Sequence, residues 1–219
     1  ALHLVKKLRS LPMRGSTVIP TITIDCEKNR PPHMNSLIDH CDIVFSNEHF
    51  PLTFKSLSEG ADEGEVVGLD GLDLDLNKIR GILRGMAAII DKFKHVSIVV
   101  TSLGANGAVL LCRESIKEAK CRQVKDFYLV REAGVKEFSA LYCYPYPLGK
   151  GPGLGKVVDT TGAGDAFIGG FISTYLDTKG ALGPALVTGT LTAASKITKP
   201  GARAGLPHGE EALVELRKK

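Results

Sequence analysis

A stretch from Val157 to Gly170 constrains the fold more than any other part of the chain. It reads Val-Val-Asp-Thr-Thr-Gly-Ala-Gly-Asp-Ala-Phe-Ile-Gly-Gly. An apolar pair leads into a turn of small residues, and the segment from Ala166 to Leu176 contains enough apolar residues to form a buried helix. This order predicts the end of a strand, a tight turn and the start of a helix.

The turn has the composition of an anion-binding site. Gly162 and Gly164 allow the backbone to turn tightly and to bring its N–H groups close to a ligand. The first turn of a helix adds unpaired N–H groups and the positive end of the helix dipole, which suit a phosphate. Asp165 follows directly and could take a proton from a hydroxyl group. These residues indicate phosphoryl transfer to an alcohol, whereas the ordinary alternative is a loop with a capping aspartate.

The longer string from Asp159 to Phe167, with Gly169 and Gly170 behind it, resembles the second signature of the PfkB family of ribokinase-like carbohydrate and nucleoside kinases. The resemblance implies an α/β fold with a ribokinase-like three-layer α/β/α sheet, and ATP with Mg²⁺ as the phosphoryl donor. It also implies the following roles: Asp165 as general base, Gly162, Ala163 and Gly164 as the anion hole, and Asp159 and Thr161 at positions that bind a monovalent cation such as K⁺ in some members.

Composition limits the remaining possibilities. A chain of 219 residues with 43% apolar content can bury one core, which argues against two full domains. The net charge is +4, but no Lys/Arg tract is interleaved with aromatic residues, so we expect no nucleic-acid partner. No apolar run approaches the ~18 residues of a membrane span, and no signal peptide is visible. We therefore expect no membrane partner and a cytoplasmic location.

The cysteines are odd in number and scattered, without a Cys-x-x-Cys pair. A reducing compartment is therefore the default, and most of these residues should be small core residues rather than members of a disulfide or zinc site. They are Cys26, Cys41, Cys112, Cys121 and Cys143.

Apolar patterning predicts alternating strands and helices. Strands are expected at 17–24, where Pro20 argues that the regular part begins after it, and at 43–45, 96–101 and 108–112. Helices are expected at 2–9, 34–40, 76–93, 166–176, 182–197 and 210–216. Two stretches stand out between these elements. The segment 59–75 is rich in Gly and acidic residues and indicates a surface insertion or a flexible loop. The segment 114–147 is longer than a link needs to be, and Pro145 and Pro147 favour an irregular packed loop over its aromatic end at 142–147.

Two short motifs stand where expected strands end. The first, Asp25 to Arg30, resembles the Asp-x-Glu-x-x-Arg of ketohexokinase-like members, which would place Lys28 or Arg30 near the phosphates; the alternative is a solvated loop. The second begins at Asn47, where many members carry Asn-x-x-Glu near magnesium and the phosphates. Asn47 matches, but Phe50 occupies the place of the glutamate. Glu48 is expected to cap the following helix, with substitution for the glutamate through bound water as the alternative.

The resemblance assigns the remaining ATP contacts to two further regions. Ser102, Gly104 and Gly107 match a Thr-x-Gly-x-x-Gly that wraps the nucleotide, with serine in place of threonine, although two glycines between strands could also be a hairpin. A helix of small residues ending in Gly-Ala borders the adenine in the family. Thr190, Ala194 and Gly201 therefore become candidate pocket residues, with close helix packing as the alternative.

The resemblance covers most of 21–207. The family's glycine-rich sugar-binding strands, early aspartate and β lid are not found before residue 20. We therefore expect residues 1–219 to be the C-terminal ATP-binding portion of a ribokinase-like kinase domain, with 1–20 a remnant of an upstream helix and loop.

Two functions stay open. One is a kinase for a sugar or nucleoside. The other is a noncatalytic nucleotide-binding or scaffold module, favoured by Phe50 and the missing half. Because the family often dimerises through the lid, a homodimer of the full-length protein also stays open.

Overall fold

The structure, a computed structural model, describes residues 23–26, 34–54, 75–113, 130–135, 138–148 and 155–207. The chain divides into two compact units. The first comprises 1–102, 110–115 and 133–140, and the second comprises 103–109, 116–132 and 141–219.

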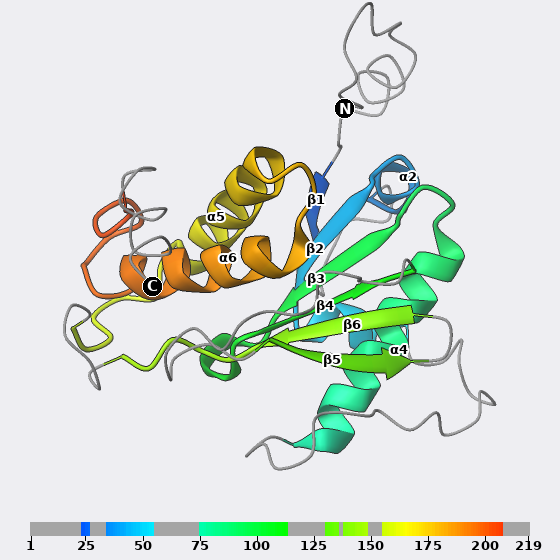
Figure 1. The fold of residues 1–219 in the computed structure, drawn as a ribbon, viewed down its shortest axis with the longest axis horizontal. Coiled ribbons are helices and arrows are strands. Elements are labelled where there is room, and N and C mark those ends of the chain that lie inside the picture. The colour runs from blue at the N-terminus through cyan, green and yellow to red at the C-terminus, as the bar shows by residue number, and fades with distance from the viewer. Residues whose placement is uncertain are drawn as a thin grey trace, which may run out of the picture. The chain divides into compact units, whose positions relative to one another are not determined.

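Six strands form one sheet in the order β1-β2-β3-β4-β6-β5 (Figure 1). They are β1 (Thr23–Cys26), β2 (Ile43–Asn47), β3 (Ile98–Ser102), β4 (Ala108–Cys112), β5 (Val130–Val135) and β6 (Phe138–Cys143). The pairs β1–β2 and β2–β3 are parallel, with Asn47 opposite Ser102. The links from β3 to β4 and from β5 to β6 are too short for a parallel crossover, so these neighbours are antiparallel and the sheet is mixed.

The first unit is built around β2 and β3. Both strands are buried along most of their length, as expected for parallel strands covered on both faces. The helices of this unit are α2 (Met34–Ile38), α3 (His49–Leu52) and α4 (Leu76–Lys92). Helix α4 contacts α3 and β3, and the Asp75 side chain caps it by accepting a hydrogen bond from the Lys78 N–H (3.1 Å). A Cβ atom on Gly85 would lie 2.1 Å from the Pro51 carbonyl oxygen, so glycine permits the close contact of α3 and α4.

The second unit contains the helix pair α5 (Ala163–Asp177) and α6 (Leu182–Lys196), which lie side by side (Figure 1). Their close approach depends on glycine on both helices. A Cβ on Gly170 would lie 2.4 Å from Thr192 Oγ1, and one on Gly189 would lie 2.9 Å from the Phe167 carbonyl oxygen. Helix packing therefore accounts for the small residues of both segments.

The expected α/β fold is confirmed, and so are the expected strands and helices that the structure describes. Two expectations were wrong. The irregular loop expected at 142–147 begins only at Tyr144, because Tyr142 and Cys143 belong to β6, and α5 begins at Ala163 rather than Ala166. The expectations for 2–9, 17–22, 59–74 and 210–216, and those for Lys28 and Arg30, fall outside the described residues.

Two further findings concern the cysteines and the helices. Cys26, Cys41, Cys112 and Cys143 are buried thiols, which agrees with their predicted role in the core. Among the helices that the structure describes, none is both long and apolar enough to cross a membrane.

Candidate active site

The turn before α5 leaves backbone N–H groups open at the start of the helix. Gly162 adopts the left-handed conformation (φ 78°) at the N-cap, and its carbonyl accepts the first helical hydrogen bond, from the Ala166 N–H (3.0 Å). The Ala163 N–H donates to the Thr160 carbonyl (3.1 Å). Within the described part of the chain, no backbone carbonyl accepts a hydrogen bond from the N–H of Gly164 or Asp165. These two N–H groups and the helix dipole make the turn suitable for an anion.

Glycine serves different purposes at the two glycine positions of the turn. A Cβ on Gly162 would lie 2.8 Å from the Ala202 carbonyl oxygen, and the positive φ is itself unfavourable for other residues. A Cβ on Gly164 would meet nothing within 4 Å. Packing therefore requires Gly162, whereas Gly164 leaves space over the open N–H groups, where a ligand could approach the backbone.

Asp159 joins the turn to the segment that follows α6. Its carboxylate accepts hydrogen bonds from the backbone N–H of Thr161 (2.9 Å) and of Gly201 (2.7 Å). Hydrogen bonds from the Thr161 backbone and side chain, then that from Gly201, together with the positive charge of Lys196, lower the pKa of Asp159 to about 2. The N–H groups of Val158 and Asp159 donate to the Ile197 carbonyl (2.8 and 3.2 Å). The predicted site residues Asp159, Thr161 and Gly201 thus lie together.

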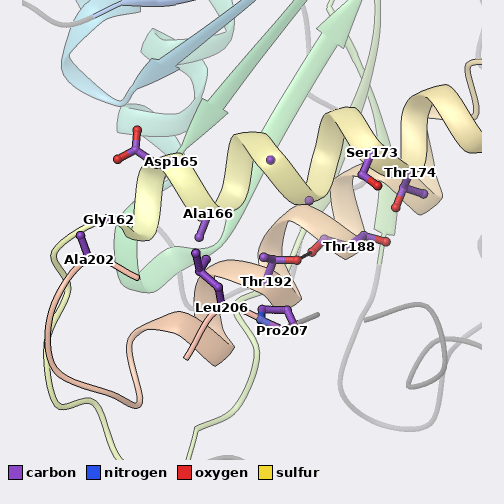
Figure 2. A pocket seen from close by; sticks show the side chains of 12 residues that line it. Gly162, Asp165, Ala166, Ser173, Thr174, Thr188, Thr192, Ala202, Leu206 and Pro207 are labelled. Atoms are coloured by element: carbon purple, nitrogen blue, oxygen red, sulfur yellow. Dashed lines mark hydrogen bonds between the residues drawn. The ribbon is translucent and has the colours of Figure 1, made fainter. Parts of the chain in front are cut away.

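Asp165 is exposed in the first turn of α5. Figure 2 shows its carboxylate projecting from the start of the helix, away from Thr188 and Thr192. No basic side chain among the described residues forms an ion pair with it. A carboxylate in this position is stabilised by the helix dipole and is accessible to a hydroxyl group from solvent or from a ligand.

A cavity of about 320 Å³ lies beside the turn, between α5, α6 and the segment 202–207 (Figure 2). Its volume is that of a small ligand site. Thr174 contributes a buried hydroxyl that has no hydrogen-bond partner among the described residues. The cavity is lined by Gly162, Asp165, Ala166, Gly169, Gly170, Ser173, Thr174, Thr188, Thr192, Ala202, Leu206 and Pro207.

The residues predicted on α6 do not line this cavity. Thr190 and Ala194 are buried, and the Thr190 hydroxyl donates to the Leu186 carbonyl one turn earlier (3.0 Å). Thr188 and Thr192, on the neighbouring face of α6, line it instead. The sequence contains the signal for these two residues, an i, i+4 threonine pair that shares one helix face. The predicted residues Thr190 and Ala194 lie on the other face of α6.

The loop after β3 has the predicted glycine geometry within the second unit. A short 3-10 turn begins at Gly104 (φ 59°) and ends at Asn106, and Gly107 (φ 87°) follows it. A Cβ on Gly107 would lie 2.1 Å from the Cys143 carbonyl oxygen, whereas one on Gly104 would meet nothing within 4 Å. The Tyr142 hydroxyl donates to the Asn106 carbonyl (2.6 Å), and burial raises the pKa of Tyr142. Gly104 is therefore the more open of the two positions.

The end of β2, in the first unit, is committed to structural contacts. Asn47 Oδ1 accepts hydrogen bonds from the N–H groups of His49 (3.0 Å) and Phe50 (3.3 Å), which caps α3. Phe50 is fully buried. The expectation that Glu48 caps this helix was wrong. Glu48 occupies the N-cap position without a capping hydrogen bond, and its carboxylate pairs with Lys78 Nζ (2.8 Å). Ser102, which pairs with Asn47 in the sheet, donates to the Ser46 carbonyl (3.4 Å).

The match to a protein-family model lies within the second unit. The family model described as pfkB family carbohydrate kinase matches residues 152–209, which include the turn, α5 and α6. A search of curated proteins finds no match.

Solved structures are similar over nearly the whole chain. Ribokinase from Cryptococcus neoformans var. grubii, in complex with ADP, has a TM-score of 0.60 at 20% identity, covering 97% of this chain and 56% of that one. Ribokinase from Thermotoga maritima has a TM-score of 0.53 at 18% identity, with 99% and 52% covered. Ribokinase from Arabidopsis thaliana, complexed with ribose and ATP, has a TM-score of 0.53 at 17% identity, with 90% and 47% covered.

The chain spans about half the length of these solved structures. At such identities the likeness concerns the fold. The protein therefore has a ribokinase-like α/β fold, and the part that carries the glycine turn is the part that resembles the pfkB family of carbohydrate kinases.

Proposed function

We propose that this protein belongs to the PfkB family and transfers a phosphoryl group from ATP to a hydroxyl of a sugar or sugar-like small molecule. One observation carries the proposal. The segment that matches the pfkB family contains a helix N-terminus with open N–H groups at Gly164 and Asp165, beside the exposed Asp165 carboxylate. An anion site next to a base is the minimum that phosphoryl transfer to an alcohol requires.

In this proposal, each part of the turn has a role. The Asp165 carboxylate accepts the proton of the acceptor hydroxyl as that oxygen attacks. The open backbone N–H groups of Gly164 and Asp165 stabilise the negative charge that develops on the transferred phosphoryl group, whereas the Ala163 N–H is already donated to the Thr160 carbonyl. Because Asp159 holds the turn through two hydrogen bonds, these N–H groups are oriented before the ligand arrives.

ATP with Mg²⁺ would supply the phosphoryl group and neutralise part of its charge. Gly104, in the left-handed conformation with open space around it, fits a loop that approaches the nucleotide closely. Asn47, Ser102, Gly107, Thr190, Ala194 and Gly201 complete the proposed ATP site. The described end of β2 gives Mg²⁺ no uncommitted carboxylate, because Glu48 pairs with Lys78. The metal would therefore be held mainly by phosphate oxygens and water.

The acceptor class and the extent of the domain are also part of the proposal. Structures of similar fold include a ribokinase complexed with ribose and ATP and a nucleoside kinase from Methanocaldococcus jannaschii, which supports a sugar or nucleoside acceptor. The motif that begins at Asp25 supports a ketohexokinase-like member, and a cytoplasmic location fits buried thiols. Residues 1–219 would be the ATP-binding portion, and the half that orients the acceptor would be supplied elsewhere.

Calorimetry with Mg²⁺-ATP on the 219-residue chain tests this proposal, together with a screen of ATP consumption against fructose, ribose and adenosine. Binding of Mg²⁺-ATP is expected, because the turn and the Gly104 loop belong to this chain. Absence of binding would contradict the proposal. Asp165→Asn removes the charge of the proposed base and should leave Mg²⁺-ATP binding nearly unchanged. Asp177→Asn is its matched control, because Asp177 is an exposed carboxylate at the other end of α5.

A second candidate is a noncatalytic nucleotide-binding or scaffold module. It is favoured by Phe50, a fully buried aromatic residue where many members have a glutamate near magnesium. Joining the chain to an acceptor-binding half separates the two functions. A kinase would then turn over a sugar or nucleoside, whereas a noncatalytic module would bind Mg²⁺-ATP and consume none.

A further inference from the structure

Lys196, the last residue of α6, is a fully buried lysine. Among the described residues it is the one charged side chain in the buried set. Its Nζ donates a hydrogen bond to the backbone carbonyl of Asp159 (2.9 Å), 37 positions earlier in the chain. A buried ammonium group is costly unless it is hydrogen-bonded or paired, so a lysine at this place needs a reason.

The surroundings of Lys196 connect the two segments that form the turn site. The N–H groups of Val158 and Asp159 donate to the carbonyl of Ile197, the residue after Lys196. The Asp159 carboxylate accepts from the Gly201 N–H, and the Ser195 hydroxyl donates to the Gly205 carbonyl. The C-terminal end of α6 adds the negative end of a helix dipole. A positive charge is therefore favourable at this junction, and Lys196 provides it.

A monovalent cation at Asp159 and Thr161, as the sequence resemblance implied, does not fit these contacts. Both Asp159 carboxylate oxygens accept backbone N–H groups, and the Asp159 carbonyl oxygen already accepts a hydrogen bond from the ammonium of Lys196. The Thr161 N–H faces the carboxylate as a donor. A cation that used these oxygens would lie next to another positive charge, which repels it.

We propose that the Lys196 ammonium takes the place of a monovalent cation in this protein. It holds the Asp159 turn against the segment 197–201, and so positions the N–H groups at the start of α5 without K⁺. Lys196 is thus a positioning residue that acts through Asp159. The inference about nucleotide binding rests on the proposed kinase function, whereas the inference about the turn can be tested on the folded protein alone.

The experiment compares melting temperature and Mg²⁺-ATP affinity in KCl and in tetramethylammonium chloride at equal ionic strength. The wild-type chain should give the same values in both salts. Lys196→Ala, which leaves a space at the junction, should melt about 2–4 °C higher in KCl than in tetramethylammonium chloride and should recover about tenfold in ATP affinity. Lys196→Met, which fills the space with an apolar chain, should show no recovery by K⁺.

Lys199→Ala is the matched control, because Lys199 is exposed three residues further along and its loss changes the net charge equally. It should show no difference between the salts. A wild-type protein that is stabilised by K⁺ would overturn the proposal, and so would a folded Lys196→Ala variant that does not respond to K⁺. If Lys196→Ala fails to fold, the wild-type comparison still decides. A wild-type chain that does not bind ATP would refute the proposed function, while the melting temperatures would still test the role of Lys196.

Discussion

The two ligand regions expected from the sequence present different chemical groups, backbone N–H groups in one and side chains in the other. The turn before α5 presents backbone N–H groups, and its conformation is fixed by Gly162 and by the hydrogen bonds of Asp159. The end of β2 presents side chains, and these are already committed, because Asn47 caps α3 and Glu48 pairs with Lys78.

This difference explains why the turn could be predicted from the sequence more fully than the end of β2. A backbone-built anion site depends on where glycine stands, and glycine positions are visible in a sequence. A side-chain site depends on which partner each side chain chooses, and several partners are usually within reach.

The largest effect is expected for Phe50→Glu, which would introduce, in α3 just after β2, the glutamate that many PfkB members carry at this place. Phe50 is fully buried and its ring lies against that of Phe54, with centroids 5.3 Å apart. An unpaired buried carboxylate should lower the free energy of unfolding by about 4–5 kcal/mol. Urea denaturation measures this, with Phe50→Leu as a control expected to lose about 1–2 kcal/mol. A stable Phe50→Glu variant with improved Mg²⁺-ATP binding would show that this region is a functional metal site after all.

Asp165→Asn should produce the next largest effect, on catalysis rather than on folding. In a form of the protein that turns over an acceptor, kcat should fall by about 10²–10⁴, because the amide cannot accept the hydroxyl proton. Mg²⁺-ATP affinity should stay nearly unchanged, since in the proposed mechanism the turn would bind through its backbone. Steady-state kinetics and calorimetry measure the two quantities. Retained turnover in this variant would refute the assignment of Asp165 as base.

Gly162→Ala and Gly201→Ala form a matched pair within the turn region. Both glycines have a positive φ, at 78° and 79°, but only Gly162 lacks space for a Cβ. We expect Gly162→Ala to lower the free energy of unfolding by about 2–3 kcal/mol and Gly201→Ala by about 1–2 kcal/mol. Equal losses would mean that the contact with Ala202 does not constrain the turn.

Asn47→Ala should cost about 1 kcal/mol of stability, the usual value for a lost helix cap. Asn47→Asp keeps an accepting oxygen at the same place and should retain most of the stability. Denaturant unfolding of both variants separates the capping role from ligand binding. If Asn47→Ala left stability unchanged but weakened Mg²⁺-ATP binding, the end of β2 would be functional and the contrast between the regions would weaken.

The smallest effect concerns pH. The pKa of Asp159 lies at about 2, below its usual value, because its hydrogen bonds favour the charged form. Its contribution to stability is therefore complete above the unfolded pKa of about 4 and is lost as the pH falls through about 2. The stability difference between wild type and Asp159→Asn should shrink over this interval. A ¹³C NMR titration of the carboxyl group gives the pKa directly, and a midpoint near 4 would contradict the hydrogen-bonded geometry.

Periodicity and glycine placement predicted α4, β2, β3 and the turn before α5. They did not predict β5 and β6, and Pro145 and Pro147, which lie just beyond β6, extended the expected irregular loop back over its last two residues. Lys196 was missed for another reason. A lysine at the end of a helix is normally exposed, and only the carbonyl of Asp159, distant in sequence, explains its burial.

The buried thiols can report how often each unit opens to solvent. Cys26, Cys41 and Cys112 belong to the first unit and Cys143 to the second, and each is at most 2% exposed. An alkylating reagent reaches a thiol only when the surrounding structure opens. With Cys121 replaced by serine, the rate of labelling at each position, read by mass spectrometry, would report how often each unit opens and whether nucleotide slows the opening of the second unit alone.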